Sequence, residues 1–581
     1  MKKNINLFKW SLLVIVLTFS NCETIDLDQT ENPSQISEDL LDPVFTFNYV
    51  QLQLPDFVNS VNGFTQRVTR QMAMTGGNTY NNAFQPVSFN NSWTLGYNIL
   101  NAIKIMEPKA IAQKEVYALG ASKVIRVYVL MTMVDMYGNI PYTQALQGSA
   151  NLNPSFDNSA DIYKGLLIEL DEAITILAQN NNPSSSKVQD LYYTSMLNWV
   201  TLANTLKLKM YSTARLAGAD LGVDIGAKIT EVVATNNIID DVSEDFAFRF
   251  GNSRFTPNTR HPMYNDQYEA GGGAYIANYM MWAMSTEKGF LTTIIDNPST
   301  VTDPRIPFYF FKQDASPDDE DAFTLPITTR PDHYNDIKYN SFYVSGVRTP
   351  FIVSNYTSGA SVPANGFWGR DHGDNSGIPP DQDKRTVGGI YPIGGSYGNP
   401  GNVQTNGDKG ALGAGIMPMI LSSYVHFMLA EIIQTNTASL PGRTAEGELE
   451  AGIRASIKKT VNLIPNYTYL AGTAPVPATL LAHEDLYWNF VKTKFNAGGT
   501  NKLELIIKEY FLAAWGNGIE PYNAYRRTGY PSNFQPTLEP ASGVFFSTGL
   551  YPANSVVNNT NAPNNVRTKK VFWDKAELIL H

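Results

Sequence analysis

The sequence predicts a mainly α-helical fold, a tetratricopeptide-like array of helical hairpins with a long loop-rich insertion that contains short β-strands. Two blocks, about 90–218 and 419–516, repeat apolar residues at spacings of three and four, which is typical of helices with one buried face. Residues 240–418, between the blocks, are rich in glycine and proline and hold only short β-prone runs. Helix pairs that bury one face must stack on neighbours, as tetratricopeptide repeats do.

The N-terminus has the pattern of a signal peptide over residues 1–21. Three lysines, Lys2, Lys3 and Lys9, precede a short apolar run from Trp10 to Phe19. At about 1.5 Å of rise per residue, this run is too short to cross a hydrocarbon core of roughly 30 Å. No later stretch is expected to cross it either, so we expect an exported chain that does not span the membrane.

The only cysteine, Cys22, directly follows this apolar run. We expect a signal peptidase to cut before Cys22 and the thiol to be acylated, with several acyl chains anchoring the protein. A buried thiol placed there by chance is the alternative, and Asn21 departs from the small residue usual before such a cysteine. Residues 22–45, polar and interrupted by Pro33 and Pro43, are interpreted as the acylated cysteine and a tether.

The first helical block is expected to contain four amphipathic helices. Pro108, Gly138-Asn139 and Asn182-Pro183 are expected to end helices. The apolar faces are Trp93, Tyr97, Leu100, Ile103 and Met106; Tyr117, Ala121, Val124, Val127, Met131 and Val134; Ile162, Leu166, Leu170, Ala173 and Leu177; and Tyr192, Met196, Trp199, Ala203, Leu206 and Met210.

The second block is expected to contain four more helices, which completes about four hairpins. The first of them carries Ile420, Tyr424, Phe427, Ala430 and Ile433 on one face. The others are expected near 445–463, 479–493 and 502–515. Trp93, Trp199 and Trp515 lie on apolar helical faces, and we expect them to be core residues.

The insertion should hold short strands and a functional surface, because a structureless loop of this length is uncommon in a compact domain. Its β-prone runs include Phe308–Phe311 and Phe351–Val353. Loops on a rigid scaffold often carry binding groups. Ligand contacts are therefore expected in residues 240–418.

Composition and motifs disfavour several classes of protein. With 43 Lys+Arg against 53 Asp+Glu the net charge is −10, which disfavours nucleic acid as a partner. The chain has no H-E-x-x-H motif, no phosphate-binding P-loop and six scattered histidines, which argues against a zinc hydrolase or a nucleotide enzyme. Residues 394–398 match the Gly-x-Ser-x-Gly nucleophile pattern, but Asn399-Pro400-Gly401 cannot begin the helix that this motif needs. A pair of carboxylates for glycoside hydrolysis remains an open alternative.

Several segments resemble proteins of the SusD/RagB family. Asp135–Tyr142 is similar to the family's aromatic-Gly-x-Ile-Pro-Tyr turn, and Trp199–Lys209 to its helix in which a Trp precedes an Asn-x-Leu-x-Leu core. Leu503–Pro531, with Arg526-Arg527-Thr528-Gly529-Tyr530-Pro531, is similar to the C-terminal block. Arg260–Tyr264 resembles the branch with an Arg-His-Pro-x-Tyr segment. Two departures from the family pattern are Tyr424, near the Ala-Glu helix, and Pro521-Tyr522 after Glu520.

The resemblance implies a single SusD-like domain over residues 46–581, on the outer face of an outer membrane. Such a protein would cap a SusC-like TonB-dependent transporter and deliver oligosaccharides, or peptides in another branch of the family. It would be a binding protein without catalytic residues or a cofactor. Two rivals from other classes are a surface-anchored glycan hydrolase and a structural adhesion lipoprotein.

Sugar binding would need loop aromatics beside polar groups, because sugars stack apolar faces on rings and pair their hydroxyls. For each candidate, the alternative is an aromatic packed beneath a loop. The expected ligand contacts are Tyr80, Phe84, Trp282, Phe367, Trp368, Arg370 and Tyr391.

Two charged features have structural as well as functional interpretations. We expect Arg526-Arg527 to brace carbonyls and a carboxylate such as Glu520 rather than to bind an anion. Acidic residues in the insertion could bind calcium, but they lack EF-hand spacing and a solvated acidic loop is favoured. These acidic residues are Asp318, Asp319, Glu320 and Asp321, and Asp371, Asp374, Asp381 and Asp383.

Overall fold

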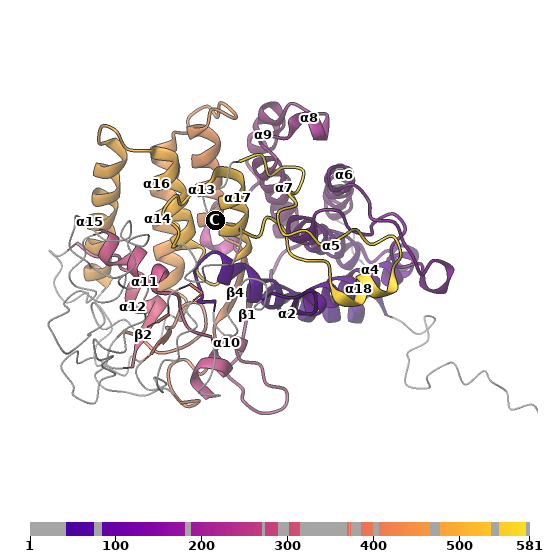
Figure 1. Cartoon of the computed structure of the whole chain (residues 1–581), viewed down its shortest axis with the longest axis horizontal. Coiled ribbons are helices and arrows are strands. Elements are labelled where there is room, and N and C mark those ends of the chain that lie inside the picture. Colours follow the sequence, from indigo (N-terminus) through magenta and orange to yellow (C-terminus); the bar gives the residue numbers. More distant parts are fainter. Residues whose placement is uncertain are drawn as a thin grey trace, which may run out of the picture.

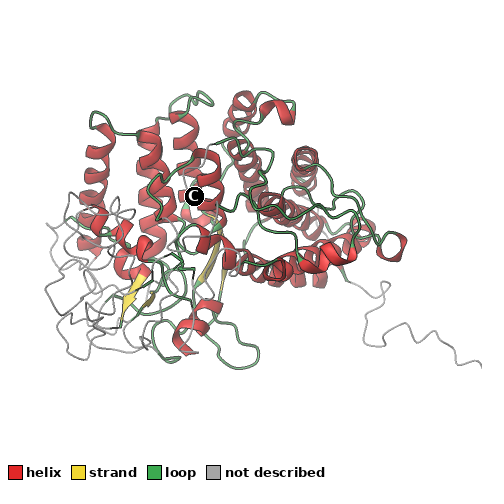
Figure 2. Ribbon diagram, viewed as in Figure 1, coloured by secondary structure: helices red, strands yellow, loops and turns green. Residues whose placement is uncertain are grey.

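Two helical blocks lie side by side, with the short elements of the insertion beneath the second block (Figure 1). Helices dominate and the strands are short (Figure 2), as the sequence predicts. The computed structural model of the chain describes residues 42–74, 84–179, 188–269, 274–288, 301–313, 369–370, 372–373, 385–398, 406–464, 477–535 and 545–576. The signal peptide, Cys22 and most of the tether lie outside these residues.

The described chain begins with α2 (Pro43–Val68), a long helix that the sequence analysis missed. Pro43 does not interrupt a regular element. It occupies the first turn, where a missing N–H costs nothing, and the Asp42 side chain accepts a hydrogen bond from Val44 N. The buried face of α2 packs against α4 and α17, so tertiary contacts stabilise the helix despite Pro55 within it.

The first block is built as predicted from four helices, each in contact with the next. Two short helices, α8 (Gly218–Leu221) and α9 (Ile225–Ala234), follow it. The four helices are α4 (Asn90–Gln113), α5 (Val116–Tyr137), α6 (Ser159–Leu177) and α7 (Met196–Thr213).

Three details of this block differ from the predictions. Pro108 lies inside α4 and does not end it, since the helix continues to Gln113 and Ala110, after the proline, is buried. Tyr192 precedes the start of α7. Contrary to our expectation, α5 is long and apolar enough to cross a membrane. However, 89% of its most apolar 18-residue stretch is buried inside the protein, as in the central helix of a core.

The second block also contains the predicted helices, and α13, α14 and α16 contact one another. Ile420 is not helical and instead ends a strand. The block is followed by α17, which the sequence analysis treated only as an exit from a helix. The helices are α13 (Ser422–Gln434), α14 (Ala445–Val461), α15 (Pro477–Asn496), α16 (Lys502–Ala513) and α17 (Ile519–Thr528).

A two-stranded antiparallel ribbon joins the two ends of the insertion. Strand β1 (Phe246–Arg249) pairs with β4 (Ile416–Ile420), from Phe246 opposite Ile420 to Arg249 opposite Ile416. Both strands contact buried parts of the helical blocks, so the insertion leaves and returns to the scaffold at one place.

Inside the insertion, β2 (Phe310–Lys312) pairs with β3 (Thr386–Gly388). The strand at 310–312 confirms part of the predicted run at 308–311, whereas 351–353 lies outside the described residues. The other elements of this region are α10 (Pro262–Tyr264), the π-helical turn η5 (Asn265–Glu269), α11 (Asn278–Met284), η6 (Thr286–Lys288) and α12 (Ile306–Tyr309).

The C-terminal segment, residues 545–576, runs back across the first block to α4, where α18 (Ala553–Asn558) lies (Figure 1). Trp573 donates a hydrogen bond from Nε1 to Asp135 Oδ1 (3.0 Å), and Tyr551 donates from its hydroxyl to Asn139 O (2.9 Å). The segment thereby covers the Asp135–Tyr142 turn. Three short 3₁₀ turns complete the fold: η2 (Pro86–Phe89), η3 (Gly148–Ala150) and η4 (Val242–Glu244).

Candidate ligand-binding cavity

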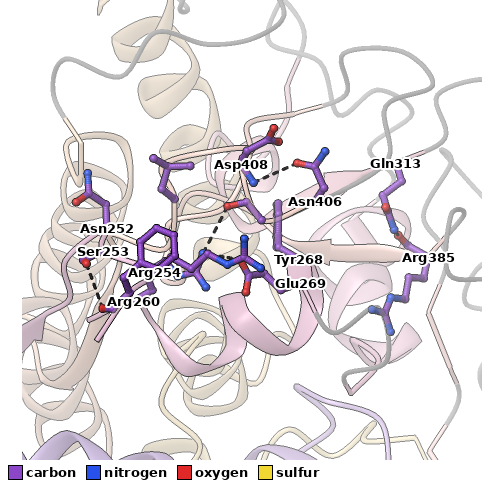
Figure 3. A pocket seen from close by; sticks show the side chains of 13 residues that line it. Asn252, Ser253, Arg254, Arg260, Tyr268, Glu269, Gln313, Arg385, Asn406 and Asp408 are labelled. Carbon is purple, nitrogen blue, oxygen red and sulfur yellow. Dashed lines mark hydrogen bonds and ion pairs between the residues drawn. The ribbon is translucent and has the colours of Figure 1, made fainter. Parts of the chain in front are cut away.

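A hollow with a volume of about 790 Å³ lies in the insertion, where ligand contacts are expected. Ligand sites usually have volumes of roughly 300 to 1,000 Å³. Figure 3 shows the side chains around it. They are Asn252, Ser253, Arg254, Phe255, Arg260, Tyr268, Glu269, Gln313, Arg385, Asn406, Gly407, Asp408 and Leu412.

Tyr268 of η5 lines the cavity and is held by a stacked tyrosine of α10. The rings of Tyr264 and Tyr268 lie 4.5 Å apart and nearly parallel, with an interplanar angle of 12°. The Tyr268 hydroxyl donates to Gly388 O (2.9 Å) and accepts from Ser396 N (2.8 Å). The π-helical turn therefore aims Tyr268 at strand β3 and ties the two walls together.

An arginine–glutamate–arginine cluster forms one wall. Glu269 Oε1 accepts from Arg260 Nη1 (2.8 Å) and lies 3.0 Å from Arg254 Nε. The hydrogen bond from Arg260 holds the pKa of Glu269 below its ordinary value, and that of Arg260 is raised in turn. Arg260 is buried and also donates to Asn265 Oδ1 (2.5 Å), whereas the Arg254 side chain is 63% exposed. Arg260 therefore fixes the wall, and Arg254 reaches into solvent.

Amide and charged groups line the rest of the cavity. Gln313 and Arg385 lie together at one end (Figure 3), where Gln313 Nε2 donates to Arg385 O (2.9 Å). Asn406 Oδ1 accepts from Asp408 N (3.2 Å) on the upper wall. These groups could pair with the hydroxyls of a polar ligand.

Phe255 is the exposed aromatic of the cavity and was missed by the sequence analysis. The residue is 80% exposed, although phenylalanine is normally buried. It follows Asn252-Ser253-Arg254 in a loop, so it meets the criterion of a loop aromatic beside polar groups. Applying that criterion to every loop of the insertion would have found it.

His261, next to Arg260 in the sequence, is buried and holds the start of α10. Its Nδ1 accepts from Met263 N (3.1 Å) and caps α10, and its ring packs edge-on against Phe250 at 4.8 Å. Burial lowers the pKa of His261 to about 3, so the ring is neutral at physiological pH. The Arg-His-Pro-x-Tyr segment is thus a structural unit, in which Arg260 forms part of the wall and Tyr264 supports the ring of Tyr268.

The predicted ligand contacts are dispersed, and three of them are buried. Phe84 packs edge-on against Phe64 at 4.9 Å, and Tyr391 stacks on Tyr309 at 5.3 Å. Trp282 is also buried, beside Tyr279 at 5.8 Å. All three side chains therefore fit the alternative interpretation, an aromatic residue packed beneath a loop. Their positions do not support a role as ligand contacts.

The remaining ligand and metal candidates lie mostly outside the described residues. This holds for Tyr80, Phe367 and Trp368, and for Asp318, Asp319, Glu320, Asp321, Asp371, Asp374, Asp381 and Asp383. Arg370 is described and lies with its guanidinium carbon 4.7 Å from the centre of the Tyr275 ring. Among the residues that are described, no three His, Cys, Asp or Glu side chains gather as a metal site would require.

Ser396 of the Gly-x-Ser-x-Gly pattern is not placed as a catalytic nucleophile would be. Its Oγ is buried and finds no hydrogen-bond partner in the described chain. Residues 397 and 398, which follow it, are not helical.

A second, smaller hollow of about 270 Å³ lies over α4 and α18. Trp93 and Tyr97 line it. Trp93 is half-buried, whereas we expected a fully buried core residue. Trp199 and Trp515 are fully buried, as expected. The volume of this hollow falls below the usual range for ligand sites.

The arginine pair of the C-terminal block braces the fold, as predicted, but with a different carboxylate. Arg527 donates to both oxygens of Glu431 at 2.7 Å, and Arg526 donates to Ser547 O and Asp135 O, also at 2.7 Å. Glu520 instead pairs with Lys209 Nζ at 2.7 Å, because it faces α7 from the first turn of α17.

Several solved structures have the same fold as this chain. Solved structures with the same fold include a chitin-binding SusD homolog from Flavobacterium johnsoniae, with a TM-score of 0.59 and 19% identity over 92% of this chain and 98% of that one. A SusD homolog from Bacteroides fragilis has a TM-score of 0.60 and 17% identity over 91% of this chain and 99% of that one.

A SusD homolog from Bacteroides uniformis is similar, with a TM-score of 0.59 and 17% identity over 92% of this chain and 100% of that one. Among curated proteins, no sequence matches the chain. The family described as "Starch-binding associating with outer membrane" matches residues 33–340 and 379–552. Because this match covers most of the sequence, the chain belongs to the SusD-like family.

Proposed function

We propose that this protein is a lipid-anchored glycan-binding protein on the exterior of an outer membrane, which captures an oligosaccharide and delivers it to a SusC-like TonB-dependent transporter. Membership of a family described as starch-binding and associated with the outer membrane supports this role. The short apolar run before the single Cys22 supports export and acylation. A structural relative is described as chitin-binding, which favours a glycan among the possible ligands.

The exposed ring of Phe255 at a polar cavity is the observation that carries the proposal. Phe255 offers a flat apolar face to a sugar ring, and the neighbouring Asn252 and Arg254 can pair with hydroxyls. The volume of about 790 Å³ suits several sugar residues of a chain.

Glu269, one of the two acids that line the cavity, is poorly suited to the acid step of glycoside hydrolysis. Glycoside hydrolysis needs one carboxylic acid that stays protonated and donates to the leaving group. Glu269 lies against two arginines, and its pKa is lowered, which is the opposite of what a general acid needs. A peptide remains the alternative ligand, since aromatic and polar loop residues also bind peptides.

Replacement of Phe255 by Ala tests the proposal. We expect affinity for a binding oligosaccharide to fall by about fivefold to thirtyfold, which corresponds to roughly 1 to 2 kcal/mol for an aromatic contact. Isothermal titration with soluble oligosaccharides of starch, of chitin and of other glycans measures the affinity, and chromatography of the mixture shows whether the ligand stays intact.

Phe45→Ala is the matched control, because Phe45 is 73% exposed on α2 and does not line the cavity. Both variants should keep the unfolding temperature of the parent protein. Equal oligosaccharide affinity in Phe255→Ala and Phe45→Ala would remove the cavity as the binding site, and cleavage of the ligand would favour the hydrolase.

A further inference from the structure

The smaller hollow over α4 and α18 combines aromatic rings with unused polar groups. Trp93 and Tyr97, one turn apart on α4, line it with ring centres 5.0 Å from each other. Asn554 and Ser555 of α18 also line it. Among the residues that the structure describes, neither the Asn554 amide nor the Ser555 hydroxyl has a hydrogen-bond partner. Both groups are therefore available to a ligand.

The lining of this hollow favours a neutral ligand. It consists of aromatic, proline, alanine, leucine, asparagine and serine residues, and no charged side chain is among those described. A charged ligand would lose hydration there without gaining an ionic partner. Apolar walls with amides and a hydroxyl beside them suit a sugar, which has an apolar C–H face and neutral hydroxyls.

Hydrogen bonds hold the walls of the hollow in place. The Tyr97 hydroxyl donates to Pro141 O (2.7 Å), and Asn559 Nδ2 donates to Pro154 O (2.8 Å). Both α4 and α18 are thus tied to the loop that forms the remaining wall. The Trp93 ring packs edge-on against a buried tyrosine of α5 at 5.2 Å, so it is fixed as well. A site built from fixed groups loses little entropy when a ligand binds.

The hollow opens to solvent on the first helical block, whereas the insertion cavity lies beneath the second (Figure 1). Leu152, at its edge, is 70% exposed, and Asn554 and Asn558 are exposed as well. The volume of about 270 Å³ is small for a site that encloses a whole ligand. It suits a single unit of a longer chain.

We propose that this hollow is a second glycan site, in which one neutral sugar unit packs against Trp93 and Tyr97 and forms hydrogen bonds with Asn554 and Ser555. The inference takes its ligand class from the proposed function but rests on different residues. Two sites on one protein raise the affinity for a long polysaccharide, because the second contact becomes intramolecular. A short oligosaccharide reaches one site at a time and gains nothing from the other.

Electrophoresis of the native full chain through gels that contain a neutral soluble polysaccharide measures this affinity. Amylopectin, glycol chitin, xyloglucan and galactomannan are the probes. Leu152→Asp places a charge at the edge of the hollow, and we expect it to weaken binding of the retarding polysaccharide by about fivefold to tenfold. Asn554→Ala removes one polar partner and should weaken binding by about threefold.

Leu481→Asp is the matched control, because Leu481 is 62% exposed on α15 and lines neither hollow. Leu152 and Asn554 are exposed, so both substitutions leave the core intact. Isothermal titration with a short oligosaccharide of the same glycan should give the parent affinity in Leu152→Asp, since the insertion cavity is unchanged. The loss should therefore appear with the polysaccharide alone.

The outcomes separate this inference from the proposed function. Equal retardation of Leu152→Asp, Asn554→Ala and Leu481→Asp would overturn the second site and leave the insertion cavity in place. Retardation that is lost in Leu152→Asp but kept in Phe255→Ala would support the hollow and remove the cavity. Retardation by casein and by no polysaccharide would assign the hollow to peptides and overturn the inference. Retardation by none of these probes would overturn both proposals.

Discussion

At the scale of single residues, the environment of each side chain separates structural from functional groups. His261 and Phe255 lie within six residues of one another, yet His261 is buried and Phe255 is 80% exposed. The sequence pattern identified the Arg-His-Pro-x-Tyr segment but could not give the exposure of its neighbours. Phe84, Trp282 and Tyr391 show the same difficulty, because a loop aromatic looks alike in sequence whether it faces solvent or the core.

Burial of His261 should make stability depend on pH. The folded pKa is about 3 against an ordinary value near 6.5, so between these values the unfolded chain binds the proton and the folded chain does not. Stability therefore falls on acidification through this window, by roughly 2 to 3 kcal/mol between pH 7 and pH 4.5 from this group alone. His261→Asn keeps an acceptor for the α10 cap but cannot titrate, so its stability should fall less steeply.

Urea unfolding at pH 7 and at pH 4.5 measures this dependence in both proteins. The smaller Asn side chain will lower stability at every pH, so the quantity to compare is the change between the two pH values. Parallel losses in the parent protein and His261→Asn would show that His261 is not the titrating group.

At the scale of helices and strands, the spacing of apolar residues predicted the helices in which no proline was taken as a break. It missed a helix whose first turn contains a proline. The helices at 90–113, 116–137, 159–177 and 422–434 carry apolar residues at the predicted spacings and were found, although 116–137 is buried on nearly every side and not on one face. Helix α2 has such a face too, but Pro33 and Pro43 suggested a tether up to residue 45, and no helix was expected directly after it. Tertiary packing against α4 and α17 makes residues 43–68 helical, because burial of a whole face outweighs the energetic penalty of one interior proline.

The contact between α17 and α2 is close enough to exclude any side chain at Gly518. A Cβ at this position would lie 2.4 Å from Gln66 N and from Thr65 Oγ1. Gly518 N also donates to Asn62 Oδ1 (2.9 Å), so the junction has little room to move. Gly518→Ala should destabilise the protein by about 1 to 3 kcal/mol through overpacking.

Gly498→Ala is the matched control, because a Cβ there meets no atom within 4 Å. Chemical unfolding of both variants measures the difference in free energy of unfolding. Equal stabilities would mean that the helices separate without cost and that the junction is not tightly packed.

At the scale of the whole molecule, the fold class could be predicted from the sequence, whereas the site could be predicted only by region. The helical array and the insertion between its blocks follow from local patterns. The cavity does not, because it joins residues 252–269, 313, 385 and 406–412, and their proximity depends on pairing of β2 with β3 and on the turns at Tyr264 and Tyr268. The carboxylate partner of Arg527 was likewise unpredictable, since Glu431 lies 96 residues away.

Anchoring through Cys22 is testable on the whole protein. Cys22→Ala should move the protein from the outer-membrane fraction to a soluble one and abolish labelling by a palmitate analogue, while its oligosaccharide affinity stays the same. Fractionation, labelling and co-purification of a large β-barrel with the parent protein measure these effects. Unchanged membrane retention and labelling of Cys22→Ala would contradict lipid anchoring at this residue.

The ribbon of β1 and β4 has a consequence for how such proteins diversify. It brings the two ends of the insertion together at one ladder, from Phe246–Ile420 to Arg249–Ile416. The entropy of closing a chain grows only with the logarithm of its length, by about 0.6 kcal/mol for each doubling. Evolution can therefore lengthen, shorten or exchange everything beyond this ladder at little cost to the helical scaffold, so new nutrient specificities can arise on an inherited frame.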